Sequence, residues 1–433
     1  MYLRFILVFA ILAIGAAFAT QGPFYALLFY LWNAYFRPEA WTYGPLLYSL
    51  NLSWVIGIYL VAITFLSMPK ARLNARTGLV FLFFLHSLLC AYLSENPVWS
   101  WNSWEQFSKV LVISYLIVVL VTDERRYRLT LLVIALSLGL EAAKQGWAQL
   151  VLNPGAKNDN NIPFLGDNNG VALGMMMLVP LFGALAQTAS SRIERYMHRF
   201  LLVGVLVRGI TTYSRGGFLA AAVLAVIGLM RSRHKIRYAV SVAMVTWLFV
   251  TVMPETYWDR ISTINAPVEE RDDSTTGRLH FWQVGLAMAN AKPFTGVGFD
   301  GYLPAYQNYN WNEEFYGDRA AHSVWFGLLA DLGYPGFILF VIIWSWGVLS
   351  AWRISRECKG DPARAHLKAY ADALLSSLIA FAVGGTFLSV QYGEMIWHLM
   401  ALSTALTIVV RERVAVVEPK PVQQVHATPA FAR

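Results

Sequence analysis

Two arginines and one histidine stand at positions where their chemistry is unusual for the surrounding sequence. Arg215, in TTYSRGGF, separates two long apolar runs, and Arg278 follows a polar stretch in STTGRLHFW. His322 lies just before another apolar run. Arginine can hold phosphate oxygens through two hydrogen bonds and can stabilise the charge of a departing diphosphate. Histidine can take a proton near neutral pH. These residue types would suit group transfer from a phosphorylated substrate.

The residues after Arg278 predict an amphipathic helix. Apolar side chains recur there at helical spacing, Thr275 or Thr276 can cap the start, and Lys292-Pro293 ends the pattern. Arg278 would then lie in the first turn, where the helix dipole disfavours a cation unless an anion binds there. The apolar residues of this helix are Leu279, Trp282, Leu286 and Ala289.

Arg208 is a further candidate for substrate binding. It precedes Arg215 by two helical turns on the same face, within an apolar run. A charged side chain inside a membrane span is costly, which makes it a functional candidate. The alternative is a structural ion pair with an acid such as Asp331 or Glu141.

The composition predicts an all-α polytopic membrane protein. The chain has 433 residues, of which 57% are hydrophobic and 14% charged, with a mean hydropathy of +0.48. A soluble protein of this length carries more charge. The formal net charge is +8, but the basic residues fall in short loops between apolar segments. We interpret them as determinants of topology and expect no nucleic-acid partner.

The apolar segments predict twelve membrane crossings, one long loop and a tail. Segment 24–36 is too short to span and is flanked by Pro23 and Pro38, so we interpret it as interfacial or re-entrant. Crossings one to ten fill 1–253, a loop with its own short helices fills 254–322, crossings eleven and twelve fill 323–411, and 412–433 is expected to be a disordered tail. The expected crossings are 3–20, 45–66, 77–94, 107–121, 129–152, 168–188, 199–214, 216–230, 236–253, 323–351, 370–388 and 396–410.

The distribution of basic residues orients these crossings. Most lysines and arginines fall in every second loop, which places those loops and both termini in the cytoplasm. Arg215, Arg278 and His322 then all lie at the outer face, where a lipid-linked diphosphate would be within reach. Their alternatives are contact with lipid headgroups for Arg215, a solvated loop position for Arg278, and packing or capping for His322.

No metal or nucleotide site is expected. The sequence has no His-Glu-x-x-His motif, and Glu394 with His398 forms a single i,i+4 pair. The acidic run EERDD at 269–273 is more typical of a solvated surface than of a cation site. No glycine-rich phosphate loop stands on the cytoplasmic side, so ATP-driven chemistry is unsupported and no cofactor is expected.

Three short motifs around the long loop resemble those of the bacterial O-antigen ligase and polymerase superfamily. Each motif is short, and their order and spacing carry the resemblance, which covers roughly residues 160–350. A further segment, FLGDNNGVAL at 164–173, also resembles a family segment, and Asp167 and Asn169 would shape the pocket there. The three motifs are Ser214-Arg215-Gly216; Gly277-Arg278 with Trp282, Pro293, Gly296 and Gly298; and His322-Ser323 with Gly327, Gly333 and Gly336.

The resemblance implies a GT-C-like ligase fold with about twelve membrane helices in the bacterial inner membrane and an active site that faces the periplasm. Members transfer a glycan from undecaprenyl pyrophosphate to a sugar of the lipid A core, without nucleotide or metal. By motif, Arg215 and Arg278 would hold the diphosphate and His322 would be the base. We therefore expect an inverting O-antigen ligase whose partners are this donor, this acceptor and membrane lipids, with an unknown oligomeric state.

Three alternatives remain. A polysaccharide polymerase or a protein O-oligosaccharyltransferase would use the same donor with another acceptor. The N-terminal FYLWNAYFRPEAW resembles a subgroup linked to exopolysaccharide or exosortase loci, and His322 is followed by serine where relatives often have asparagine. A glycan or lipid transporter is a different class, but no inverted repeat is recognisable in the sequence.

Overall fold

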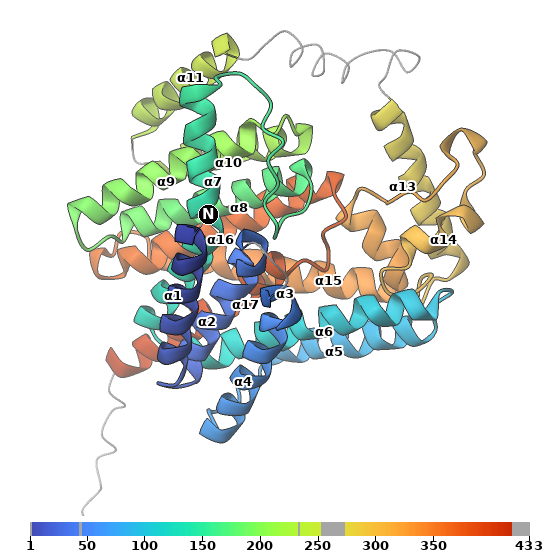
Figure 1. The fold of residues 1–433 in the computed structure, drawn as a ribbon, viewed down its shortest axis with the longest axis horizontal. Coiled ribbons are helices and arrows are strands. Elements are labelled where there is room, and N and C mark those ends of the chain that lie inside the picture. Colours follow the sequence, from blue (N-terminus) through green and yellow to red (C-terminus); the bar gives the residue numbers. More distant parts are fainter. Residues whose placement is uncertain (1, 43–45, 233, 253–272, 418–433) are drawn as a thin grey trace, which may run out of the picture.

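The computed structural model describes residues 2–42, 46–232, 234–252 and 273–417. This part of the chain folds into helices and contains no β-strand (Figure 1). The helices are α1 (Tyr2–Ala19), α2 (Pro23–Phe36), α3 (Leu46–Ser49), α4 (Leu52–Ser67), α5 (Ala75–Tyr92), α6 (Pro97–Leu120), α7 (Glu124–Leu152), α8 (Asn168–Gln187), α9 (Arg192–Ile210), α10 (Arg215–Arg231), α11 (Lys235–Val252), α13 (Asp273–Ala291), α14 (Tyr302–Tyr309), α15 (Val324–Glu357), α16 (Ala365–Gly384) and α17 (Glu394–Val417).

The helices make the protein a mostly helical, multi-pass membrane protein. Within the described residues, seven helices are long and apolar enough to cross a bilayer, namely α5 to α8 and α15 to α17. Two more apolar helices, 5–19 and 52–67, are shorter. The other expected crossings correspond to helices α9, α10 and α11. The expected crossing 45–66 differs, because its described part is two helices, α3 and α4, separated by a turn at Leu50 and Asn51. The count of twelve stays a prediction.

Several expectations about boundaries can be compared with the helices. Segment 24–36 is a short helix, α2, which begins at Pro23 and ends before Arg37, a residue in left-handed conformation. Leu27 and Leu31 of this helix are completely buried. The last helix, α17, runs to Val417, six residues beyond the expected end of the last crossing's domain at 411. Most of EERDD and the tail from 418 lie outside the described residues.

The core of the bundle is built around α8. This helix packs against α9, α10 and α16, and its Met175 and Met176 are fully buried. By contrast, α4 exposes large apolar side chains such as Phe65 and Leu66. Apolar surface of this kind is expected where a helix faces lipid. The inner helices therefore form a rigid support whose ends can carry a site.

A second, smaller core joins α13 and α14 to the start of α15. Phe281, Val284 and Met288 of α13 pack with Tyr302 and Tyr306 of α14. In Figure 1 these two helices lie at the right, beside the ends of α5, α6 and α15. The predicted helix after Arg278 therefore exists, but the expected packing face is right only in part, since Ala289 is completely buried and Trp282 half-buried. Its Leu279 and Leu286 are exposed, because the core lies on the side of Phe281.

The small core is attached to α15 at a break in that helix. Gly333 has φ 64° and ψ −171°, a conformation essentially restricted to glycine. A Cβ at Gly333 would lie 2.5 Å from the carbonyl oxygen of Pro293. The Tyr334 amide donates to that same oxygen at 2.8 Å, and the Val297 amide donates to the carbonyl of Ala330 at 2.9 Å. These contacts hold the segment after α13 against α15.

Candidate functional site

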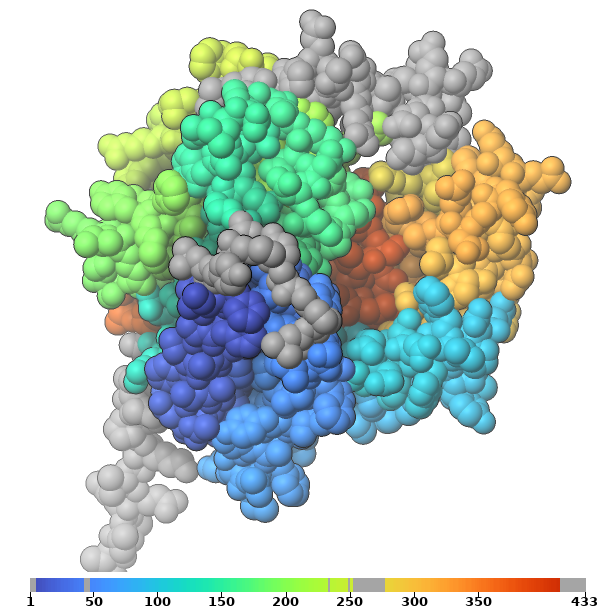
Figure 2. Space-filling model, viewed as in Figure 1, coloured from blue at the N-terminus to red at the C-terminus, as the bar shows by residue number. Residues whose placement is uncertain are grey.

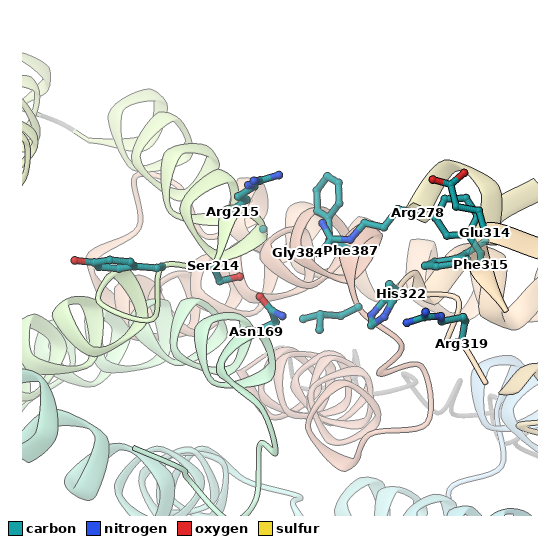
Figure 3. A pocket seen from close by; sticks show the side chains of 14 residues that line it. Asn169, Ser214, Arg215, Arg278, Glu314, Phe315, Arg319, His322, Gly384 and Phe387 are labelled. Atoms are coloured by element: carbon teal, nitrogen blue, oxygen red, sulfur yellow. The ribbon is translucent and has the colours of Figure 1, made fainter. Parts of the chain in front are cut away.

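A cavity of about 470 Å³ lies where the ends of α10, α13 and α15 meet. Arg215, Arg278 and His322 all line it (Figure 3). These residues come from three segments that are far apart in the sequence. The structure thus brings together the three residues for which the sequence predicts chemistry.

Arg215 is the first residue of α10, and the sequence around it explains its position. Ser214 caps the helix by accepting a hydrogen bond at its Oγ from the Gly217 amide at 3.3 Å. Gly217 lies against α8, where a Cβ would be 2.5 Å from the Cβ of Ala172. The preceding residue, Tyr213, has a φ of 60°. The SRGG sequence therefore allows α10 to begin close to α8 and places Arg215 at the cavity.

Arg278 reaches the cavity from the side of α13. The helix begins at Asp273, so Arg278 lies in its second turn. The expectation of a first-turn position is therefore wrong, and so is the anion-binding argument from free helix amides. Its guanidinium carbon lies 5.9 Å from the centroid of the Phe387 ring, within the range of a cation–π contact. In Figure 3 the Phe387 ring is seen between Arg215 and Arg278.

His322 lies directly before α15 in a left-handed backbone conformation with φ 45°. Such a conformation is uncommon for residues other than glycine, and it is concentrated at functional positions. The next residue, Ser323, is the N-cap of α15. The His322 ring is half-buried, and its centroid is 6.3 Å from that of Phe281. The small core and the capped helix therefore fix the position of this imidazole.

The electrostatic surroundings of His322 favour its neutral form. Burial lowers the pKa of the imidazole below its usual 6.5, and the positive charges of Arg278 and Arg319 lower it further. The negative charge of Asp167 acts in the opposite direction. Near pH 7 the imidazole is therefore uncharged and can accept a proton.

Arg319 is a site residue that the sequence reasoning misses. It lines the same cavity, as do Glu314 and Phe315 from the same loop. Figure 3 shows the Arg319 side chain beside His322. The signal was present in GDRAAH, where a cation precedes the histidine by three residues. With Arg215 and Arg278 it gives three guanidinium groups and one carboxylate around the cavity, a surplus of positive charge suited to an anionic ligand.

Arg208 does not line this cavity. It is fully buried, and its Nε donates to Gln145 Oε1 at 2.8 Å. Its other nitrogens donate to the backbone carbonyls of Asn158, at 3.4 Å, and Asn160. Of the acids considered as ion-pair partners, Glu141 pairs with Lys144 at 2.5 Å. Arg208 thus ties α9 to α7 and to the segment before α8.

The other acid considered for Arg208 lies elsewhere. Asp331 is buried in α15 and accepts hydrogen bonds from the Tyr302 amide at 2.9 Å and from Gln391 and Tyr392 at 3.2 and 3.1 Å. It therefore links α14 and the segment before α17 to α15.

Asp167 and Asn169 lie at the start of α8. Asp167 is the N-cap, and its carboxylate accepts a hydrogen bond from the Gly170 amide at 2.8 Å. Asn169 lines the cavity, whereas Asp167 influences it through its charge on His322.

Glu394 and His398 lie on α17, outside this cavity. The His398 Nδ1 is 3.0 Å from the Tyr35 hydroxyl, and both side chains are buried. Among the residues that the structure describes, no group of three or more histidines, cysteines and acids is placed to hold a metal ion.

Comparison with known proteins gives two matches to family models. Residues 200–341 match the family described as O-antigen ligase, and this range contains Arg215, Arg278 and His322. Residues 3–182 match a family of unknown function. No curated protein matches the chain.

Proposed function

The chain belongs to the O-antigen ligase and polymerase superfamily, whose members are glycosyltransferase-like membrane enzymes, and from this starting point we propose a specific reaction. The protein transfers a glycan from undecaprenyl pyrophosphate to a sugar hydroxyl of the lipid A core, at the periplasmic face of the inner membrane. The observation that carries the proposal is the single cavity lined by Arg215, Arg278, Arg319 and His322.

The arginines supply the charge that the departing diphosphate needs. Arg215 and Arg278 hold the phosphate oxygens from opposite sides, and Arg319 adds a third positive charge. When the bond between the anomeric carbon and the phosphate oxygen breaks, its electron pair stays on that oxygen. Fixed guanidinium groups stabilise this developing charge without any reorganisation. The mechanism therefore needs no metal ion.

His322 activates the acceptor. Its neutral imidazole takes the proton of the acceptor hydroxyl as the oxygen attacks the anomeric carbon. One direct displacement forms the new glycosidic bond on the face opposite the leaving diphosphate, so the configuration inverts. The imidazolium formed in this step shares the cavity with the diphosphate, across the anomeric carbon from it, and the opposite charges attract.

The test is transfer by the purified protein with a glycan on undecaprenyl pyrophosphate, a lipid A–core acceptor and EDTA. We expect His322→Ala to lower the rate by about 10²- to 10⁴-fold, the range for a general base. Arg278→Ala should lower it by about 10²- to 10³-fold, as for loss of one oxyanion donor. Arg199→Ala changes an exposed arginine of α9 and is the matched control. Near-normal transfer by Arg278→Ala contradicts the proposed role.

The same experiment separates the ligase from a polymerase, which the family match fits equally well. A single addition to the core supports the ligase. A ladder of chain lengths without glycosylated core, still abolished by His322→Ala, assigns the same site to polymerisation.

A further inference from the structure

Three arginines come together at the end of the helix bundle that lies away from the candidate site. Arg76 is in the first turn of α5, Arg353 lies near the end of α15, and Arg411 lies toward the end of α17. The candidate site is at the start of α15, so these residues are at the other end of that helix. In Figure 1 the end of α17, in red, lies at the left, and α13 and α14 lie at the right. Arg76, Arg353 and Arg411 are called the arginine cluster below.

The guanidinium of Arg76 joins three helices. One of its terminal nitrogens donates to Ser350 Oγ of α15, and the other donates to Thr407 Oγ1 at 3.3 Å and to the carbonyl oxygen of Ser403 at 3.5 Å, both on α17. Its central carbon lies 5.4 Å from the centroid of the Trp346 ring, within the range of a cation–π contact. All these partners are neutral, so the half-buried charge of Arg76 is held in place without being balanced by a carboxylate.

Arg353 and Arg411 add two positive charges beside Arg76. Both side chains are exposed, and the charges of both act on Arg76 by repulsion. Within the part of the chain that the structure describes, neither forms an ion pair with an acid, and Glu412, which follows Arg411, pairs with Arg72 at 2.6 Å. Like charges held together cost free energy unless an anion binds between them.

A small cleft of about 50 Å³ adjoins the arginine cluster. It is lined by Arg76 and by apolar side chains of the surrounding helices, among them Leu79, Val80, Val118 and Ile343. The helix α5 borders it and is the least buried of the seven candidate spans, with 22% of its residues buried against 56% or more in the others. Figure 2 shows the light blue and cyan part of the chain, which holds α5 and α6, at the surface of the molecule. This side of the bundle therefore faces lipid.

The charges and the cleft together indicate an anionic amphiphile. Guanidinium groups bind phosphate through charge-assisted hydrogen bonds, so a phosphate group satisfies the cluster. A free phosphate would leave the adjoining apolar cleft unfilled. A phospholipid satisfies both, because its phosphate lies at the level of the helix ends and its acyl chains run beside the helices into the bilayer. Basic pockets between membrane helices bind anionic lipid headgroups in this way.

We propose that the arginine cluster binds the phosphate headgroup of an anionic phospholipid and that one acyl chain of this lipid enters the cleft beside Arg76. The cleft admits a short part of the chain, and the rest lies against exposed apolar side chains of α5 such as Phe81 and Leu85. The lipid stabilises the ends of α5, α15 and α17 by neutralising charges that repel one another. The site is separate from the proposed function, because the arginine cluster lies outside residues 200–341, the match to the O-antigen ligase family.

The test is lipid binding to the purified full-length protein in detergent, measured by native mass spectrometry. The probes are phosphatidylglycerol and phosphatidylcholine with the same acyl chains, which differ in net charge. We expect phosphatidylglycerol to bind about 10-fold more tightly. Arg353→Ala and Arg411→Ala change exposed side chains and should each weaken its binding by about fivefold, the usual effect of one basic residue near an anionic lipid, and the double variant by about 25-fold.

Two controls make the outcome specific. Arg195→Ala removes an exposed arginine of α9, so it changes the net charge by the same amount, and it should leave binding within twofold. Inorganic phosphate should displace the bound lipid no better than chloride at the same ionic strength, because it has no acyl chain for the cleft.

The inference is overturned if the two lipids bind equally, or if the double variant, with an unchanged melting temperature, binds phosphatidylglycerol as the wild type does. An equal loss in Arg195→Ala would show that net charge and not the arginine cluster decides binding. Displacement by inorganic phosphate beyond that by chloride would assign the cluster to a free anion. None of these results bears on the proposed function, which the transfer assay decides at the other end of α15.

Discussion

Replacing Arg208 with methionine separates a structural role from a role in substrate binding. The guanidinium is fully buried and donates to Gln145 and to the carbonyls of Asn158 and Asn160. Methionine replaces the aliphatic stem of the arginine, but it is shorter, leaves the space of the guanidinium group empty and donates no hydrogen bond. The change therefore leaves three acceptors between α7, α9 and the segment before α8 without their donor.

The cost follows from these contacts. Each buried acceptor that loses its partner costs about 1–3 kcal/mol, and the apolar burial of methionine offsets part of the sum. We expect a net loss of about 3 kcal/mol in the free energy of unfolding. An unfolding entropy of about 2.1 cal/mol/K per residue, applied to 433 residues, gives about 0.9 kcal/mol/K. The melting temperature should therefore fall by about 3 °C.

The assay measures melting in detergent together with the Kd for undecaprenyl pyrophosphate. Arg208→Met should melt about 3 °C lower yet bind the diphosphate within threefold of the wild type. Arg199→Met, at an exposed position of the same helix, should change neither quantity. An unchanged melting temperature with binding weakened 10-fold or more would refute this reasoning and establish Arg208 as a substrate ligand.

Two further predictions concern the base and the support of the loop. Because the pKa of His322 is already low, transfer should persist at pH 6.5 and decline only in more acidic buffer. Arg319→Gln removes a positive charge, so it should raise the pKa of His322 and move the acidic limb of the pH–rate profile to higher pH. Asp167→Asn removes a negative charge, so it should move that limb to lower pH, and the asparagine can still cap α8. Shifts of the same sign in the two variants would contradict the assignment. Gly333→Ala brings a Cβ to 2.5 Å from the carbonyl oxygen of Pro293, in a backbone conformation essentially restricted to glycine. The variant should therefore have a lower melting temperature, and its loop after α13 should be cut more readily by protease. An unchanged digestion pattern would contradict this.

The sequence predicts the helices well because the bilayer imposes their length and composition. Every expected apolar segment is largely helical, although 45–66 is divided into α3 and α4, and the short segment 24–36 is a short helix. The packing face of α13 could not be predicted in the same way. That helix packs on a small protein core shared with α14, and the position of α14 places Phe281 rather than Leu279 at the interface.

Some residues of the candidate site could be predicted from the sequence and others could not. Arg215, Arg278 and His322 could be predicted because each is a polar residue at the edge of an apolar or patterned segment. The partners of Arg208 could not, since two of them are backbone carbonyls, which leave no trace in the residue types. The arginine cluster was also beyond sequence reasoning, because its members come from three helices that are far apart in the sequence.

The left-handed backbone of His322 has a consequence for anyone who engineers this protein. Such a conformation costs a residue other than glycine roughly 1–3 kcal/mol. Directed evolution for heat resistance or expression yield would therefore select substitutions at position 322 that increase folding stability. Glycine adopts the left-handed conformation without this cost, and asparagine adopts it at a lower cost than histidine. Either replacement would remove the proposed base. A screening campaign should consequently score glycan transfer at every round, because stability alone would reward well-behaved but inactive protein.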